Sequence, residues 1–292
     1  MVACLVSGLI CTLALSVLAY VAGRGLGLLQ GRWSPLFFAI TLCLTAVLPL
    51  SLAGGIEWFE WLPAPDVLLW SSAITPFLCF TAALATCNSG LRSFSRSFVA
   101  AILVMLALGN TLLPLLRPAF SPVRLSEETQ WCDGICLQSH ISTCAPAAAV
   151  TLLRNAGIIA EERDLVRVCS TSDQGTESLS LYRGVRIYSN TVFHKICVAS
   201  SNTDAWLTGH QLPNLAIVHF NAPNVAFPSQ LFSPSVNRHA VVVFGRNDVG
   251  EWVIGDPAFG KTTWSDEEFQ ARFTGEALYV AGPCKKFESS IY

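Results

Sequence analysis

Four long apolar runs near the start of the chain constrain its fold more than any other feature. They cover residues 2–22, 35–54, 67–87 and 98–116, and none of them contains Asp, Glu, Lys or Arg. Each run has about 20 residues, the length that an α-helix needs to cross the apolar core of a bilayer. We therefore predict an all-α domain of four transmembrane helices over residues 1–118, in a multi-pass integral membrane protein that contacts the lipid bilayer.

The rest of the chain predicts a linker and a separate folded domain. Residues 119–130 contain Pro122, two serines and the pair Glu127-Glu128, a composition typical of a linker. Residues 131–292 are enough for one hydrophobic core. The first apolar run resembles a signal peptide, but no basic residue precedes it and three more runs follow, so we expect a retained helix.

The charges between the apolar runs predict an orientation. They are Arg24 and Arg32 after the first run, Glu57, Glu60 and Asp66 after the second, and Arg92 and Arg96 after the third. Basic loops are retained in the cytoplasm, so we expect both termini and the C-terminal domain to lie outside it. Arg117 and Arg124, on the outer side of the fourth run, weaken this bias.

Beyond the linker, the chain contains four residues suited to thiol catalysis, in the order Gln138, Cys144, His239 and Asp256. In such a set, a thiolate attacks a carbonyl, an imidazole transfers the proton, a carboxylate orients the imidazole and an amide donates a hydrogen bond to the oxyanion. Each of these roles has one candidate. The order and the residue types are those of a papain-like catalytic set.

The sequence around Cys144 predicts that this residue begins a helix. Ser142 and Thr143 are cap residues, Pro146 stands at an early helical position where its missing N–H has little cost, and Gly157 is a natural left-handed stop. The dipoles at a helix start favour negative charge, so we expect the pKa of the Cys144 thiol to fall.

His239 and Asp256 each lie in an apolar, strand-like run. The segment between the two runs, Arg246-Asn247-Asp248-Val249-Gly250, has the composition of a hairpin turn. Antiparallel neighbours of this kind bring His239 and Asp256 side by side.

These residues resemble the bacteriocin-processing cysteine peptidases, cysteine peptidase family 39, which remove leaders after a double glycine. The resemblance covers about residues 130–282 and includes Thr171, Gly175-Thr176 before Leu179, residues 212–219 and residues 256–275. It implies an α+β papain-like fold, with the catalytic helix at the N-terminal end of the domain packed on an antiparallel sheet. It further implies Cys144 as nucleophile, His239 as general base, Asp256 as the residue that orients it and Gln138 as oxyanion donor. The chain has Ala145 where the family usually has Gly.

We therefore predict a membrane-anchored cysteine peptidase that hydrolyses exported or leader peptides, without a cofactor or a metal. Two other functions use the same fold: acyl or aminoacyl transfer to an amine, and non-catalytic peptide binding. The formal net charge of −2 and the lack of a basic stripe argue against a nucleic-acid partner. Residues 255–262 match the phosphate-loop pattern G-x-x-x-x-G-K-T, which requires a helix directly at Lys261. Extended residues follow Lys261 instead, and we expect the next helix to begin only at Ser265, so we expect no ATP.

Four further residues have alternative interpretations. Cys132 and Cys136 are spaced for a disulfide outside the cytoplasm, whereas a zinc site lacks a second ligand pair. His140 lies before the helix start, where we expect a structural role. His219 ends a strand-like run and is expected to lie close to His239, at a position that the family resemblance marks as non-catalytic.

Overall fold

The structure is a computed structural model, and it describes residues 2–29, 33–52, 74–126, 128–189, 194–220 and 238–282. The chain divides into two compact units, and the border that precedes the linker falls between Leu116 and Arg117. Each unit is described by itself.

The N-terminal unit is helical, as the apolar runs predict. Its described helices are α1 (Val2–Leu29), α2 (Ser34–Leu52), α4 (Ile74–Cys87) and α5 (Ser93–Phe120). Among the described residues, the segments Gly8–Leu29 and Ser93–Leu113 are long and apolar enough to cross a membrane, and Ser34–Val47 and Ile74–Cys87 are shorter apolar helices. Part of the prediction lies outside the described residues, namely residues 53–54 and 67–73 of the expected spans and the charges Arg32, Glu57, Glu60 and Asp66.

The first and last of these helices are longer than the apolar runs predict. Helix α1 continues to Leu29, so Arg24 lies within a helix and not in a loop. Close packing against α4 explains the extension, because a Cβ atom added at Gly23 would lie 2.6 Å from the Phe80 carbonyl oxygen, and one at Gly27 would lie 2.7 Å from Cys87 Cβ. Helix α5 runs from Ser93 to Phe120, so it includes Arg96 and the first residues of the expected linker.

Hydroxyl groups take part in several of the polar contacts between the described helices of this unit. The Oγ1 atoms of Thr45 and Thr81 lie 3.1 Å apart, and those of Thr75 and Thr111 lie 2.9 Å apart. The Asn110 amide nitrogen donates to Thr75 Oγ1 over 3.3 Å. Such hydrogen bonds between helices are typical of membrane bundles, where no water competes for them.

The C-terminal unit is built on a six-stranded antiparallel sheet with strand order β3-β8-β4-β5-β6-β7. The strands are β3 (Lys195–Val198), β4 (Asn214–His219), β5 (Arg238–Arg246), β6 (Trp252–Asp256), β7 (Gly260–Trp264) and β8 (Phe273–Ala281), and a small hairpin, β1 (Trp131–Cys132) and β2 (Ile135–Cys136), precedes them. The helices are α6 (Cys144–Asn155), α7 (Glu162–Val168), α8 (Ser178–Ser189), α9 (Asp204–Thr208) and α10 (Asp266–Arg272). This α+β architecture confirms the predicted fold class.

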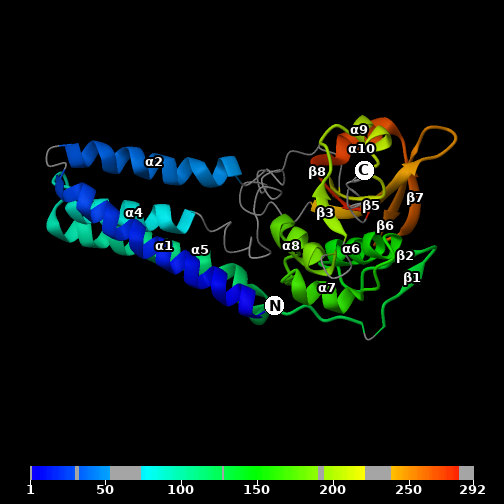
Figure 1. Cartoon of the computed structure of the whole chain (residues 1–292), viewed down its shortest axis with the longest axis horizontal. Helices are drawn as coiled ribbons and strands as arrows, with labels where there is room; N and C mark the ends of the chain where they lie inside the picture. Colours follow the sequence, from blue (N-terminus) through cyan, green and yellow to red (C-terminus); the bar gives the residue numbers. More distant parts are fainter. Residues whose placement is uncertain are drawn as a thin grey trace, which may run out of the picture. The chain divides into compact units, whose positions relative to one another are not determined.

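The two faces of the sheet bury two separate cores. Side chains alternate between the faces of a strand, so Leu215 and Ile217 of β4 pack in the core that contains α6, α7 and α8. Ala216 and Val218 pack on the opposite face, in the core that contains α9 and α10. Figure 1 shows the two groups of helices on either side of the sheet. The central strands are therefore covered on both faces.

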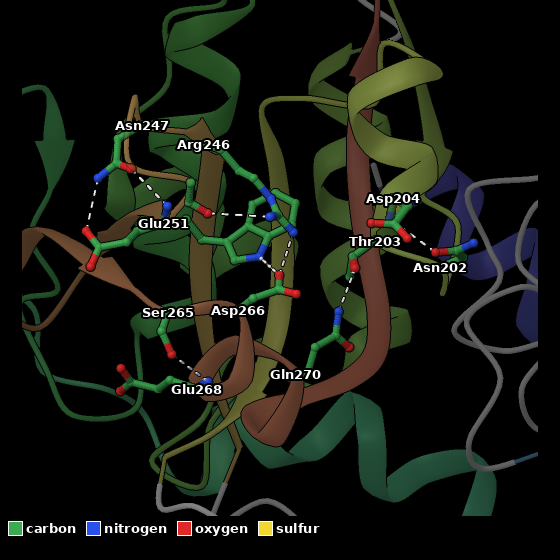
Figure 2. Close-up of polar contacts among 12 residues, drawn as sticks. Asn202, Thr203, Asp204, Arg246, Asn247, Glu251, Ser265, Asp266, Glu268 and Gln270 are labelled. Atoms are coloured by element: carbon green, nitrogen blue, oxygen red, sulfur yellow. Dashed lines mark hydrogen bonds and ion pairs between the residues drawn. The ribbon is translucent and has the colours of Figure 1, made fainter.

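Polar contacts fasten α10 to the strands that carry the site. Asp266 accepts hydrogen bonds from Arg246 over 2.5 Å and from the Trp252 indole over 2.8 Å, as Figure 2 shows. Ser265 caps the helix by accepting the Glu268 N–H over 3.2 Å, at the helix start that the sequence predicts.

The disulfide considered for Cys132 and Cys136 is not formed, and both are free thiols. In the β1–β2 hairpin, Cys132 pairs with Ile135 and Trp131 pairs with Cys136. Successive side chains of a strand point to opposite faces, so the two cysteines lie on different faces of the hairpin. Cys136 is buried and Cys132 is exposed, an arrangement that cannot meet disulfide geometry.

Candidate active site

Cys144 is the first residue of helix α6, as the sequence predicts. The helix ends after Asn155, and Gly157 has the expected left-handed backbone with a φ of 76°. The capping detail differs from the prediction, because no side chain caps the helix start. Instead, Thr143 Oγ1 donates to the His140 carbonyl over 2.8 Å and accepts the His140 N–H over 3.1 Å. These bonds close the loop that leads into Cys144.

His239 and Asp256 lie on adjacent strands joined by the predicted hairpin. Strands β5 and β6 pair antiparallel, and the turn between them is closed by bonds from the Asn247 N–H to the Glu251 carbonyl and from the Gly250 N–H to the Asn247 carbonyl, each 2.9 Å long. His239 Nε2 lies 2.7 Å from Asp256 Oδ1. Both side chains are buried, with 8% and 6% exposed.

The electrostatics of His239 favour the imidazolium. Burial lowers the pKa of His239, but hydrogen bonds to Asp256 and Cys144, together with the charges of these two residues, outweigh it and raise the pKa from 6.5 to about 9. An imidazole has two nitrogens, and Nε2 contacts Asp256, so Nδ1 is the nitrogen left for the thiol of Cys144. The raised pKa therefore keeps the His239 ring protonated at neutral pH, with the Cys144 thiol beside it.

A turn after β6 holds both the carboxylate and the Gln138 loop. Asp256 Oδ1 accepts a second hydrogen bond, from the Ala258 N–H over 2.8 Å. The next residue, Pro257, accepts the Gln138 N–H over 2.9 Å. Gln138 therefore lies beside the Asp256 turn, and its Oε1 is buried with no hydrogen-bond partner among the described residues.

A cavity of about 240 Å³ adjoins the histidine and the carboxylate. Its described lining residues are Val218, His219, Phe220, His239, Asp256, Phe259, Trp264 and Arg272. The ring of Phe220 meets the His239 imidazole edge to face, with the centroids 5.6 Å apart. His219 pairs with Arg238 across the strands, while Val218 pairs with His239, so His219 lies near His239 as expected.

Sequence reasoning did not single out Phe220, Trp264 or Arg272 as neighbours of the site. Phe220 directly follows a strand-like run, and Arg272 ends a segment that begins with acidic residues. The sequence around these two residues contains no motif that indicates a functional site. Arg272 donates to the Phe220 carbonyl over 3.3 Å and lies over the Trp264 ring, 4.8 Å from its centroid. It also forms an ion pair of 2.7 Å with Glu268. Only the three-dimensional structure places these residues together.

The remaining candidates have structural positions. The His140 ring accepts the Ser142 N–H at Nδ1 over 3.2 Å, as expected for a structural role. Lys261 lies on β7 and not at the start of a helix, so residues 255–262 do not have the geometry of a phosphate loop. Over the described parts of the chain, no group of three or more His, Cys, Asp or Glu side chains is placed to hold a metal ion.

The sequence profile of the peptidase C39 family matches residues 134–285, more than half of the chain and all of the candidate site. The chain belongs to the peptidase C39 family. It is therefore a cysteine-type peptidase, a hydrolase, and the sequence-based recognition is confirmed. An uncharacterized protein of Methanothermobacter thermautotrophicus is 26% identical over 152 residues, which cover 52% of this chain and 91% of that protein.

Solved C39 peptidase domains are also similar. The peptidase domain of Streptococcus ComA, a bifunctional ABC transporter, is 21% identical, with 50% of this chain and 96% of that domain covered and a TM-score of 0.39. A double-glycine-motif protease from an AMS/PCAT transporter, in complex with a leader peptide, is 18% identical, with 54% and 94% covered and a TM-score of 0.39. These TM-scores are low, so the family assignment rests on the sequence match.

One departure from the usual C39 sequence lies directly after Cys144. Ala145, in place of the usual glycine, is only 5% exposed and packs in the core around α6. Its methyl group therefore contributes to the core of this C39 peptidase.

Proposed function

We propose that Cys144, His239, Asp256 and Gln138 together hydrolyse the peptide bond in this C39 peptidase. The Cys144 thiolate attacks the carbonyl carbon, and Gln138 donates to the resulting oxyanion. His239 gives its proton to the leaving amine, and a thioester remains on Cys144. A water molecule then attacks the carbonyl carbon of this thioester, and His239 takes a proton from the water. The bond to the sulfur breaks, which releases the carboxylate product and restores Cys144 and His239 to their starting state.

The observation that carries this proposal is the buried contact of 2.7 Å between His239 and Asp256, with the Cys144 thiol interacting with the same ring. The carboxylate orients the ring and stabilises its positive charge, as in other triads. Cys144 stands at the start of a 12-residue helix, where the amide dipoles favour a thiolate. The same arrangement suits transfer to an amine, but hydrolysis is the reaction of the family.

We propose leader or exported peptides as substrates, with cleavage after a double glycine as the first specificity to test. A double-glycine-motif protease with its leader peptide is among the similar structures. We further propose that the N-terminal helices anchor the peptidase as a multi-pass membrane protein, which is supported by the two apolar segments Gly8–Leu29 and Ser93–Leu113. The basic residues Arg92 and Arg96 favour an extracytoplasmic catalytic domain.

Thiol labelling and turnover test the catalytic proposal directly. Burial raises the pKa of Cys136 and of Cys169 to about 12, so both remain unreactive thiols at neutral pH. We expect a thiol-directed peptide probe to modify Cys144 first and Cys144→Ala to abolish hydrolysis. Cys132 is exposed, so a Cys132→Ser background removes its labelling and serves as the control for activity.

Two outcomes would favour the other functions. Equal labelling of Cys144 and Cys169, without hydrolysis of any peptide, would favour a peptide-binding module. Full hydrolysis by Cys144→Ala would show instead that another group is the nucleophile. Consumption of an added amine in place of water, seen as an amide product by mass spectrometry, would show a transferase.

The proposed orientation has its own test. External protease on spheroplasts should cut within the linker, and a reporter fused at Tyr292 should be active only if it requires an extracytoplasmic location. A protected linker, together with an active cytoplasmic reporter, would invert the orientation and leave the catalytic proposal intact.

A further inference from the structure

The loop that carries Gln138 is held through backbone hydrogen bonds. The N–H groups of Leu137 and Gln138 donate to the carbonyls of Gln130 and Pro257, each over 2.9 Å. The next N–H, that of Ser139, donates to a side chain, the Glu162 carboxylate, with a distance of 3.0 Å to Oε1. The backbone on both sides of the Gln138 side chain is therefore fixed.

Glu162 is an unusual residue to find in this place. It lies in the first turn of α7 and is only 3% exposed. Burial of a carboxylate costs free energy unless the carboxylate accepts hydrogen bonds. A negative charge at the start of a helix is favourable. The charge of Glu162 also acts on the loop that carries Gln138. Burial is the main cause of the raised pKa of Cys136, the residue before Leu137, and the charge of Glu162 raises it further.

Nothing among the described residues binds the oxygen end of the Gln138 side chain, since its Oε1 is buried without a partner. The backbone that bears this side chain is therefore the part of Gln138 that hydrogen bonds of the described residues hold in place. The Pro257 carbonyl holds one peptide group of Gln138, and the Glu162 carboxylate holds the following one. The first contact comes from the Asp256 turn and the second from a separate helix.

We propose that Glu162 is a positioning residue for the oxyanion side of the reaction: it holds the Ser139 N–H and thereby aims the Gln138 amide at the developing oxyanion. This inference rests on the proposed role of Gln138. It adds a residue that neither reacts nor touches the substrate, yet sets the geometry on which oxyanion stabilisation depends.

The proposal predicts a specific pattern of defects in Glu162→Ala. Misplacement of one oxyanion donor should lower kcat by about tenfold to a hundredfold with little change in KM. A peptide aldehyde should bind more weakly by a similar factor, because its tetrahedral hemithioacetal adduct with Cys144 places its oxygen where the oxyanion of the reaction forms. Alkylation of Cys144 by iodoacetamide should keep the wild-type rate, since that reaction needs the thiolate and no oxyanion donor.

Four further variants make the test decisive. Glu162→Gln keeps an acceptor oxygen and should restore most of kcat, whereas Glu162→Asp keeps the charge but shortens the reach and should not. Glu161→Ala, at the exposed neighbouring position, is the matched control and should match the wild type. In a Gln138→Ala background, Glu162→Ala should cause little additional loss, because it acts through the residue already removed.

Several results would overturn the inference. They are an unchanged kcat in Glu162→Ala, a full additional loss in the Gln138→Ala background, or an equal fall in the alkylation rate and kcat. If Glu162→Ala does not fold, as judged by thermal unfolding, Glu162→Asp decides in the same assays. Failure of the catalytic proposal looks different, because Cys144→Ala would then retain hydrolysis whatever residue stands at position 162.

Discussion

The two units of this protein differ in the side chains that they expose to their surroundings. Helix α1 exposes Val17, Leu18 and Val21, each more than 60% accessible, whereas α6 of the peptidase domain buries every residue from Ala145 to Leu153. The buried polar side chains of the N-terminal helices are hydroxyls for the most part, and they are Thr12, Ser16, Ser34, Thr45, Thr75, Thr81, Asn88 and Thr111. Among its described residues, the N-terminal unit thus buries hydroxyls together with a small apolar cluster around Leu78 and Leu103, while many of its large apolar side chains are exposed.

The proposed membrane anchor predicts such a difference, because the two units would then face different solvents. Water favours an apolar core and a polar surface, as in the peptidase domain. Lipid gives no such drive between helices, so small residues and hydroxyl pairs hold the bundle together while apolar side chains face outward. Gly23 and Gly27 against α4, and the Thr45–Thr81 contact, fit the second case. The predictions below test each side of the comparison.

The largest effect is expected at the catalytic histidine. His239→Ala should lower kcat/KM by about 10²- to 10⁴-fold, the usual contribution of general acid–base catalysis. Asp256→Asn should cost less, because an amide can still orient the imidazole. His219→Ala, at the same cavity, should stay close to the wild type in a peptide-cleavage assay. Retained activity in His239→Ala, with a loss in His219→Ala, would show that the wrong histidine was chosen.

The pH dependence of the peptidase domain should follow the raised pKa of His239. A folded-state pKa of about 9, above the unfolded value of 6.5, stabilises the folded state fully below pH 6.5, and this contribution is lost as the pH rises through 9. This contribution of His239 to the free energy of unfolding amounts to about 3 kcal/mol. Denaturant unfolding of the wild type and His239→Gln, followed by tryptophan fluorescence, measures it.

The same titration should appear in the rate. Activity that requires the imidazolium should fall as the pH rises through about 9, with an apparent pKa that belongs to the Cys144–His239 pair. A stability difference between the two proteins that does not change from pH 6 to pH 10 would contradict the assigned charge state.

The apolar outer face of the N-terminal unit can be tested with one charge. Leu18 lies in the middle of the segment Gly8–Leu29 and is 64% exposed. Leu18→Arg should oppose insertion by about 2.5–3.5 kcal/mol if this face contacts lipid. Leu29→Arg, at the helix end, is the control, because its side chain can reach the interface. Equal resistance of both variants to carbonate extraction would argue against a lipid-facing helix.

Local patterns in the sequence predicted much of the peptidase domain. The start of α6 at Cys144, its stop at Gly157, the hairpin between β5 and β6 and the cap at Ser265 each depend on a few adjacent residues. Local rules of capping and turn formation are sufficient for such features. The cysteine, histidine and carboxylate could be chosen because each occurs in one of these local patterns.

Contacts between distant segments could not be predicted in the same way. Glu162 lies 23 positions from Ser139, and nothing near Glu162 indicates that its carboxylate is buried. Phe220 meets His239 only because β4 and β5 are neighbours in the sheet. Helix α1 is longer than its apolar run because its glycines pack on α4, a contact that periodicity in one segment does not report.

The smallest expected effect compares one buried hydroxyl in each unit. In the bundle, Thr75→Val removes the contact with Thr111, and we expect a loss of about 0.6 kcal/mol, the average for hydrogen bonds between membrane helices. In the peptidase domain, Thr151→Val leaves the buried Cys136 N–H without its acceptor, 2.9 Å away, and should cost about 1–3 kcal/mol. Unfolding of the full chain in mixed micelles, by detergent for the bundle and by denaturant for the peptidase domain, measures both. A loss in Thr75→Val as large as that in Thr151→Val would mean that the bundle interior behaves like the core of a water-soluble domain, and the contrast between the two units would then fail.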